Sequence, residues 1–188
     1  MVKRFRVWAG TLGLLFGVVV DAVAEVEYEY GWQVPRPYIA PDVVAVDDQG
    51  YRKECNSCHF AYPPGFLPAR SWQALMTGLN HHFGENAELS PEVRARMQKY
   101  LEAHAADHST AIGSLRVMHY MKPDEIPLRL TDTYYIKLRH RNIPARIFSN
   151  NPQLKSLSNC NGCHQRADSG YFNEGEVRIP GMEQWEER

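Results

Sequence analysis

The 188-residue sequence has little of several features that define whole classes of protein. It has no excess of charge of either sign, because 21 Lys and Arg stand against 22 Asp and Glu, and this balance excludes a generally basic nucleic-acid binder. It has no uncharged apolar run of about 18 residues beyond its N-terminal segment, so we expect no internal membrane span. With 44% hydrophobic residues it is neither disordered nor fibrous. These absences leave a globular protein of one or two small domains.

The first 24 residues have the order of a secretory signal. Residues 1–6 carry three basic side chains, residues 7–20 are uncharged, and Ala22, Val23 and Ala24 have the small side chains of a cleavage site. The uncharged stretch has 14 residues, fewer than the about 20 that a spanning helix needs. The sequence therefore predicts a signal peptide (residues 1–24), cleavage after Ala24 and export to an oxidising compartment. An uncleaved anchor is the alternative.

Only four cysteines are present, and all of them fall in two copies of one pattern, residues 55–59 (CNSCH) and residues 160–164 (CNGCH). In this pattern the two thiols form thioether bonds to a haem, and the adjacent imidazole binds the iron as proximal ligand. A zinc site would place its two pairs about 15 to 20 residues apart, whereas 101 residues separate Cys58 from Cys160. Disulfides or a thioredoxin-like site leave both histidines unexplained. The sequence predicts two covalently bound haem c groups, held by Cys55, Cys58, Cys160 and Cys163, with His59 and His164 on the irons.

Proline, glycine and helix-capping residues divide the rest of the chain. Residues 25–51 are rich in Pro, Tyr and acidic side chains and predict an extended segment without regular structure. Ser71 is expected to cap an apolar-faced helix that Gly84 ends. Ser90, which precedes a proline, predicts the start of a second helix that runs to about Asp107.

The predicted fold is mainly α, because strand signals are weak throughout. We expect two small haem-binding lobes with a boundary near residue 112. The first lobe (residues 25–111) should resemble a compact class I-type cytochrome c, and the second (residues 112–188) should be loop-rich, with a short helix after Thr131. Each lobe is so small that its haem is expected to supply much of the apolar centre.

The sixth ligand decides the redox character of each iron, since imidazole lowers the potential, methionine raises it and an open position permits catalysis or gas binding. For the first haem, helical geometry turns His82 toward the apolar face and His81 toward solvent. His104 is a rival, because it falls in the middle of the apolar face of the next helix. Met118 and Met121 have the spacing of a late methionine ligand, and both fit equally well as core residues.

For the second haem the nearest candidate is His140, 24 residues before His164. Arg139 and Arg141 flank it and could face the haem propionates. The alternative is an ordinary histidine in a basic surface patch.

The sequence also resembles the small exported dihaem cytochrome c family (DHC). The resemblance rests on the following residues around and between the motifs: Pro64, Leu67, Pro68, Ser71, Trp72, residues 82–87 (HFGENA), Thr131, His140, residues 158–164 (SNCNGCH), Ala167, Gly170, Ile179 and Pro180. It implies electron transfer in the periplasm through two low-potential bis-histidine haems, with His82 and His140 as distal ligands. It also implies redox partners, namely a high-spin, oxygen-binding monohaem cytochrome c and a membrane b-type cytochrome as donor.

Two classes of function follow. The first is an electron carrier without enzymatic activity, in which Arg139, Arg141 and Arg146 are candidate docking charges. The second is a haem enzyme or gas sensor with one open iron, for which His104, His119 or Arg116 could supply acid and base groups. A fixed haem subunit of a larger respiratory complex is a further alternative.

Overall fold

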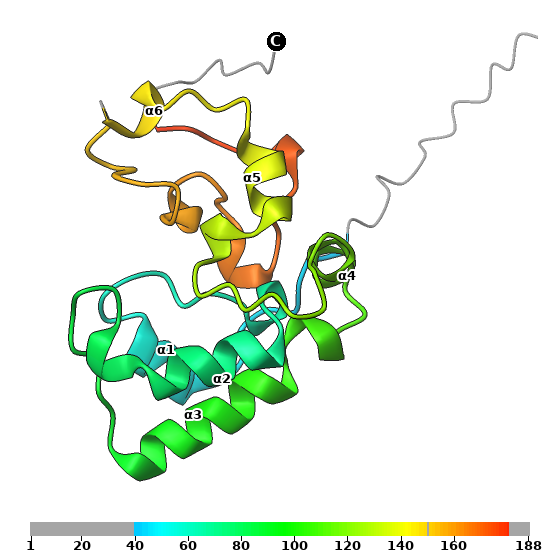
Figure 1. Ribbon diagram of the computed structural model, residues 1–188. Helices are drawn as coiled ribbons and strands as arrows, with labels where there is room; N and C mark the ends of the chain where they lie inside the picture. Colours follow the sequence, from blue (N-terminus) through cyan, green and yellow to red (C-terminus); the bar gives the residue numbers. More distant parts are fainter. Residues whose placement is uncertain (1–39, 150, 181–188) are drawn as a thin grey trace, which may run out of the picture. The chain divides into compact units, whose positions relative to one another are not determined.

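The structure is a computed structural model in which residues 40–149 and 151–180 are described. The chain divides into two units, Met1–Pro37 and Tyr38–Arg188, and the described residues lie in the second. The predicted signal peptide falls outside them. The described residues form helices and loops with two isolated bridges and no β-strand, so the predicted mainly α fold is confirmed (Figure 1).

The helices are short, and several are single 3-10 turns. The α-helices are α1 (Gln49–Cys55), α2 (Ala69–Thr77), α3 (Pro91–Ala103), α4 (Ile112–His119), α5 (Tyr134–His140) and α6 (Arg146–Ser149). The 3-10 turns are η1 (Pro64–Phe66), η2 (Leu79–His81), η3 (Ala106–His108), η4 (Leu130–Asp132), η5 (Cys160–Gly162), η6 (Ala167–Ser169) and η7 (Glu174–Glu176).

Helix α3 begins where the sequence predicts. The Ser90 hydroxyl accepts a hydrogen bond from the Val93 N–H at 3.3 Å, and a proline occupies the first helical position. The helix ends at Ala103, four residues earlier than expected. The predicted helix after Ser71 differs more: α2 begins at Ala69, so that Ser71 lies inside the helix and is buried.

Helix α2 ends at Thr77 rather than at Gly84. The Gly78 N–H donates to the carbonyls of Ala74 and Leu75, both at 3.1 Å, and closes the helix one turn before the histidines. The chain continues as the 3-10 turn η2. The helical angles used to orient His81 and His82 therefore do not apply, although His81 is exposed as expected.

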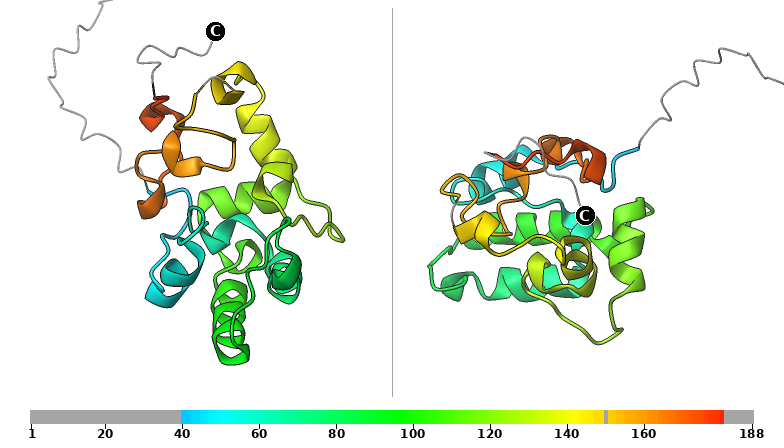
Figure 2. Two further views of the ribbon diagram at one scale, coloured as in Figure 1. Left: turned by 90° about the vertical axis from the view of Figure 1, so that its left-hand side faces the viewer. Right: turned by 90° about the horizontal axis from the view of Figure 1, so that it is seen from above.

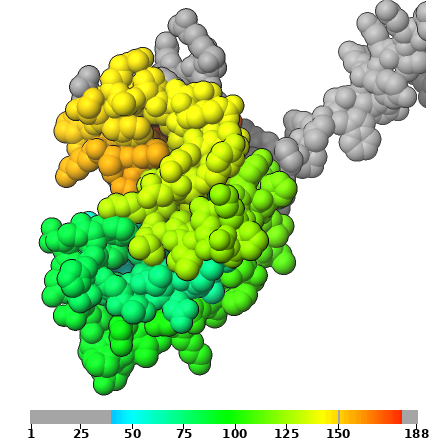
Figure 3. Space-filling view, viewed as in Figure 1, coloured from blue at the N-terminus to red at the C-terminus, as the bar shows by residue number. Residues whose placement is uncertain are grey.

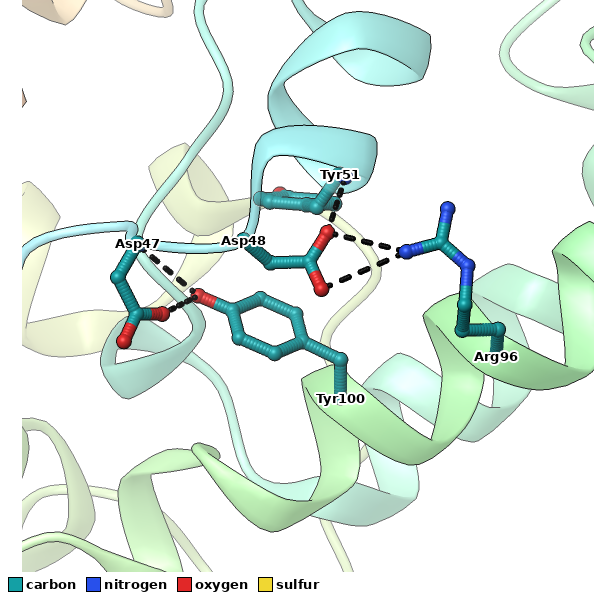
Figure 4. A network of polar contacts seen from close by, with 5 residues as sticks. All are labelled: Asp47, Asp48, Tyr51, Arg96 and Tyr100. Atoms are coloured by element: carbon teal, nitrogen blue, oxygen red, sulfur yellow. Dashed lines mark hydrogen bonds and ion pairs between the residues drawn. The ribbon is translucent and has the colours of Figure 1, made fainter.

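The expected extended segment ends in helix α1, which begins at Gln49. Polar contacts connect the start of α1 to α3 (Figure 4). Asp48 caps α1 by accepting from the Tyr51 N–H at 2.7 Å, and Arg96 of α3 approaches the same carboxylate at 3.3 Å. The Tyr100 hydroxyl donates to Asp47 at 3.1 Å. Because α1 ends at Cys55, this network fixes the position from which the first cysteine pair starts.

Two clusters of buried side chains form the core of the described residues. The larger one gathers residues from α1 to α4 and includes Leu67, Met97 and Leu101, all at most 1% exposed. The smaller one lies beside the second motif and consists of Ile147, Leu154 and Ile179. Figure 3 shows residues of the 130–160 region lying directly against residues of the 65–125 region.

Contacts cross the predicted lobe boundary at several places. Helix α4, which starts at the boundary, contacts η1 and η3 on one side and α5 on the other (Figure 2). The N–H groups of Asp42 and Val43 both donate to the Gly170 carbonyl, at 2.9 and 3.2 Å. A side chain at Gly170, whose φ is +81°, would meet the Val43 carbonyl at 2.1 Å, so this close approach requires glycine. The division into lobes at residue 112 stays a prediction.

No helix within residues 40–149 and 151–180 combines the length and the hydropathy that crossing a membrane demands.

Candidate haem-binding sites

The first cysteine pair follows directly from α1, and its histidine faces a second imidazole. The ring centroids of His59 and His82 are 6.0 Å apart, and the rings are inclined by only 22°. The Nδ1–H of His59 donates to the Phe60 carbonyl at 2.9 Å, because a carbonyl can only accept. This bond leaves the Nε2 lone pair of His59 free for a metal.

A tight turn presents His82. The Glu85 N–H donates to the His82 carbonyl at 3.1 Å, and the two residues between them, Phe83 and Gly84, have φ values of +54° and +102°. Positive φ at both central positions is the geometry of a type I′ turn. Phe83 is strained there, and the Arg129 guanidinium covers its ring, 3.8 Å from the centroid.

The second cysteine pair is matched by a histidine at the end of α5. The ring centroids of His140 and His164 are 6.1 Å apart, and the rings cross at 80°. The Nδ1–H of His140 donates to the Ile136 carbonyl one turn earlier at 2.8 Å. His140 thus keeps its Nε2 available, as His59 does.

A cavity of about 400 Å³ opens between the histidines of the second pair. Its lining includes Cys160 and Cys163 of the motif, and also Tyr62 and Asp42, which precede residue 112. Ligand pockets in proteins have volumes of about 300 to 1,000 Å³. The second motif therefore faces a cavity large enough for a planar cofactor, and part of its wall comes from the N-terminal half of the chain.

The ring spacing fits one metal ion between each pair of imidazoles. An imidazole nitrogen binds a transition metal at about 2 Å, and the ring centre lies about 1 Å further away, so two rings on one ion have centroids about 6 Å apart. The observed separations are 6.0 and 6.1 Å. The donor set and the two cysteines at each place fit an iron porphyrin attached through thioethers.

Burial favours the metal-binding form of the second pair. It lowers the pKa of His140, and burial together with the neighbouring His140 lowers the pKa of His164 to about 4. Burial, followed by the neighbouring His59 and Arg129, also lowers the pKa of His82. Neutral imidazole is the form that binds a metal.

The other candidate ligands lie elsewhere. His104 is exposed, its Nδ1–H donates to the Tyr100 carbonyl at 2.8 Å, and its ring contacts the Tyr100 ring. The expectation that His104 points inward is wrong, because α3 ends before it and the chain turns. His108 and His119 are exposed as well, and Met121 packs against the larger core cluster.

Tyr62 was not singled out by the sequence, yet it touches both sites. Its ring stacks on His59 with a centroid separation of 5.2 Å, and its hydroxyl donates to the Ser158 carbonyl at 2.7 Å, two residues before Cys160. Burial, chiefly, raises the pKa of Tyr62 to about 12. The only sequence signal for this role was an aromatic residue four positions after Cys58, and the contacts of Tyr62 with both sites are visible only in the fold.

The arginines predicted to dock partners or face propionates are all exposed. Arg139 forms an ion pair with Glu174, and both residues line the cavity together with Arg178. Arg141 donates to the Leu138 carbonyl at 3.2 Å.

Two attachment motifs, each with a second imidazole held opposite its own, define the class as a c-type cytochrome with two haem sites. The model of the dihaem cytochrome c family matches residues 51–172. The chain therefore belongs to the dihaem cytochrome c family, in which two covalently bound haem c groups and electron transfer are implied.

Solved structures agree with this assignment. A diheme cytochrome c from Rhodobacter sphaeroides shares 39% identity and a TM-score of 0.62, over 69% of this chain and 100% of that one. A diheme cytochrome c from Shewanella baltica OS155 shares 37% identity and a TM-score of 0.60, over 73% of this chain and 97% of that one. The search of curated proteins gave no match.

Proposed function

We propose that the mature protein is an exported, periplasmic electron carrier in which both irons are held by two histidines, His59 with His82 and His140 with His164. The observation that carries the proposal is the pair of imidazole separations near 6 Å. The bound haems supply one-electron chemistry at low potential. The chain supplies the ligands, and burial lowers the pKa of His82, His140 and His164, which favours their neutral form. The bonds from Nδ1 of His59 and His140 fix the Nε2 atoms of these two residues.

Spin state and carbon monoxide binding test the ligand assignment. Two six-coordinate irons should show a low-spin spectrum, and the ferrous protein should bind carbon monoxide slowly and incompletely. Variants His82→Ala and His140→Ala should each open one iron, whereas His104→Ala and His119→Ala should leave the spectrum unchanged. Rapid, stoichiometric carbon monoxide binding by the unaltered protein would favour an open-site enzyme or gas sensor.

The proposed partner is a high-spin monohaem cytochrome c, with a membrane b-type cytochrome as donor. Transient redox contacts usually bury less than about 1,200 Å². Arg139, Arg141 and Arg146 are exposed, and Arg139 is paired with Glu174. Mixing the reduced protein with an oxidised high-spin cytochrome should transfer electrons at a rate that falls with added salt. A transfer rate that does not depend on salt concentration would argue against docking by charge.

N-terminal sequencing of the protein from the periplasmic fraction tests export, with Glu25 as the expected first residue.

A further inference from the structure

An arginine stands beside the first histidine pair and an aspartate beside the second, where the cavity wall also holds Arg178 and the ion pair of Arg139 with Glu174. Beside the first pair lies Arg129. Its guanidinium is 3.8 Å from the centre of the Phe83 ring, and that ring is 4.8 Å from the ring of His82.

Beside the second pair lies Asp42. It lines the same cavity as His164, and its carboxylate accepts a hydrogen bond from the Phe172 N–H at 2.8 Å. The Phe172 ring contacts the His164 ring, with centroids 5.2 Å apart. Asp42 lies outside the residues that the family model matches.

The position of Asp42 is firmly determined. Its own N–H donates to the Gly170 carbonyl at 2.9 Å, and its carbonyl accepts from the Gly113 N–H of α4 at 2.7 Å. These bonds fix the backbone of Asp42 beside the second site, independently of the bond between its side chain and Phe172. Arg129, by contrast, is exposed and is held by its contact with Phe83.

We propose that Arg129 raises the reduction potential of the iron between His59 and His82, and that Asp42 lowers the potential of the iron between His140 and His164. The proposal rests on the proposed ligand assignment. A ferric site carries one more positive charge than a ferrous site, so a nearby carboxylate stabilises the oxidised form and a nearby guanidinium destabilises it. Together the two charges favour the electron at the first site, where Cys58 and His59 are exposed.

Charge-neutralising variants of the haem-loaded protein test this. Redox titration followed by electron paramagnetic resonance reports each iron separately, and His82→Met and His140→Met assign the signals. Asp42→Asn should raise the potential of the second iron by at least about 28 mV, which corresponds to an about threefold higher ferrous-to-ferric ratio at a given applied potential. The potential of the first iron should stay unchanged. Arg129→Gln should lower only the first potential, by a smaller factor because Arg129 is exposed.

Matched controls separate the local charge from net charge and from structure. Glu92→Gln and Arg94→Gln change the same charges on the exposed side of α3 and should move neither potential. In the Asp42→Asn variant the amide oxygen can still accept from the Phe172 N–H, so the fold should persist, and far-ultraviolet circular dichroism checks it.

The unaltered protein provides a second measurement. Raising the ionic strength toward 1 M shortens the Debye length to about 3 Å and should reduce the effect of exposed Arg129 more than that of half-buried Asp42. Shifts no larger than those of the controls, shifts of the opposite sign, or equal shifts of both irons would overturn the proposal. Rapid carbon monoxide binding would instead refute the ligand assignment, so the two failures are distinguishable.

Discussion

The rings of His140 and His164 cross at 80°, whereas those of His59 and His82 are inclined by 22°. Imidazole planes that are nearly parallel act on the same iron d orbital and split the two π-type orbitals, and crossed planes leave them close in energy. The ferric protein should therefore show two different low-spin resonance signals, one rhombic and one highly anisotropic with a larger maximal g value. His140→Met should remove the anisotropic signal and His82→Met the rhombic one. Two indistinguishable rhombic signals would contradict the geometry.

The turn after His82 predicts a backbone effect. Gly84 has a φ of +102°, and no atom lies within 4 Å of the place where a Cβ would stand. Gly84→Ala should cost about 1 to 2 kcal/mol through the strained backbone alone. Denaturation of the haem-loaded protein by guanidinium measures this cost. Gly78→Ala is the control, because its φ is −100° and an added Cβ makes only ordinary contacts. Equal losses in the two variants would contradict a backbone cause.

The small cluster beside the second motif predicts a large effect of one leucine. Leu154 is 0% exposed and packs between Ile147 and Ile179. Leu154→Ala should lower the free energy of unfolding by about 2 to 5 kcal/mol, since it removes buried surface and leaves a cavity. Leu115, which is 50% exposed, should tolerate the same change within about 0.5 kcal/mol. A small loss at Leu154 would show that the attached haem, rather than this cluster, supports the segment.

Alkaline pH should destabilise the protein through Tyr51. This residue is 3% exposed, its hydroxyl donates to the Tyr62 carbonyl at 2.8 Å, and burial raises its pKa well above the usual value. The folded state therefore keeps a proton that the unfolded state releases above about pH 10, so stability is present below that pH and declines above it.

Guanidinium titrations from pH 8 to 11 measure this decline. Tyr51→Phe should lose about 1 kcal/mol at pH 8, because the hydrogen bond is gone, and should show a shallower decline above pH 10. Tyr134→Phe is the control, since Tyr134 is 58% exposed. An unchanged slope in Tyr51→Phe would assign the decline to other groups.

The cysteine chemistry and part of the helical structure followed from local patterns. The motif residues predict haem attachment because two thiols with two residues between them can form the thioether bonds, and the adjacent histidine can bind the iron. The start of α3 followed from Ser90 and the next proline, because capping is a contact between residues three apart. The helical character of the fold also followed from periodicity.

Where a helix ended, prediction was weaker. Helix α2 ends before His81 and His82, and α3 ends before His104. The helical angles from which the sequence assigned each histidine to an apolar or a solvent-facing side therefore do not apply. The resemblance named His82 and His140, and the structure brings each of them within about 6 Å of a motif histidine. Their role as ligands stays a prediction.

The sequence by itself predicted which residues attach the cofactors, because each attachment motif consists of five consecutive positions. Only the tertiary structure decided what surrounds them. Tyr62 reaches Ser158 across 96 positions, and Asp42 reaches Phe172 across 130. Contacts of this kind depend on how distant segments pack, and no local period or motif encodes them. The relative orientation of the imidazole rings has the same origin, since it depends on a turn at His82 and on the end of α5 at His140.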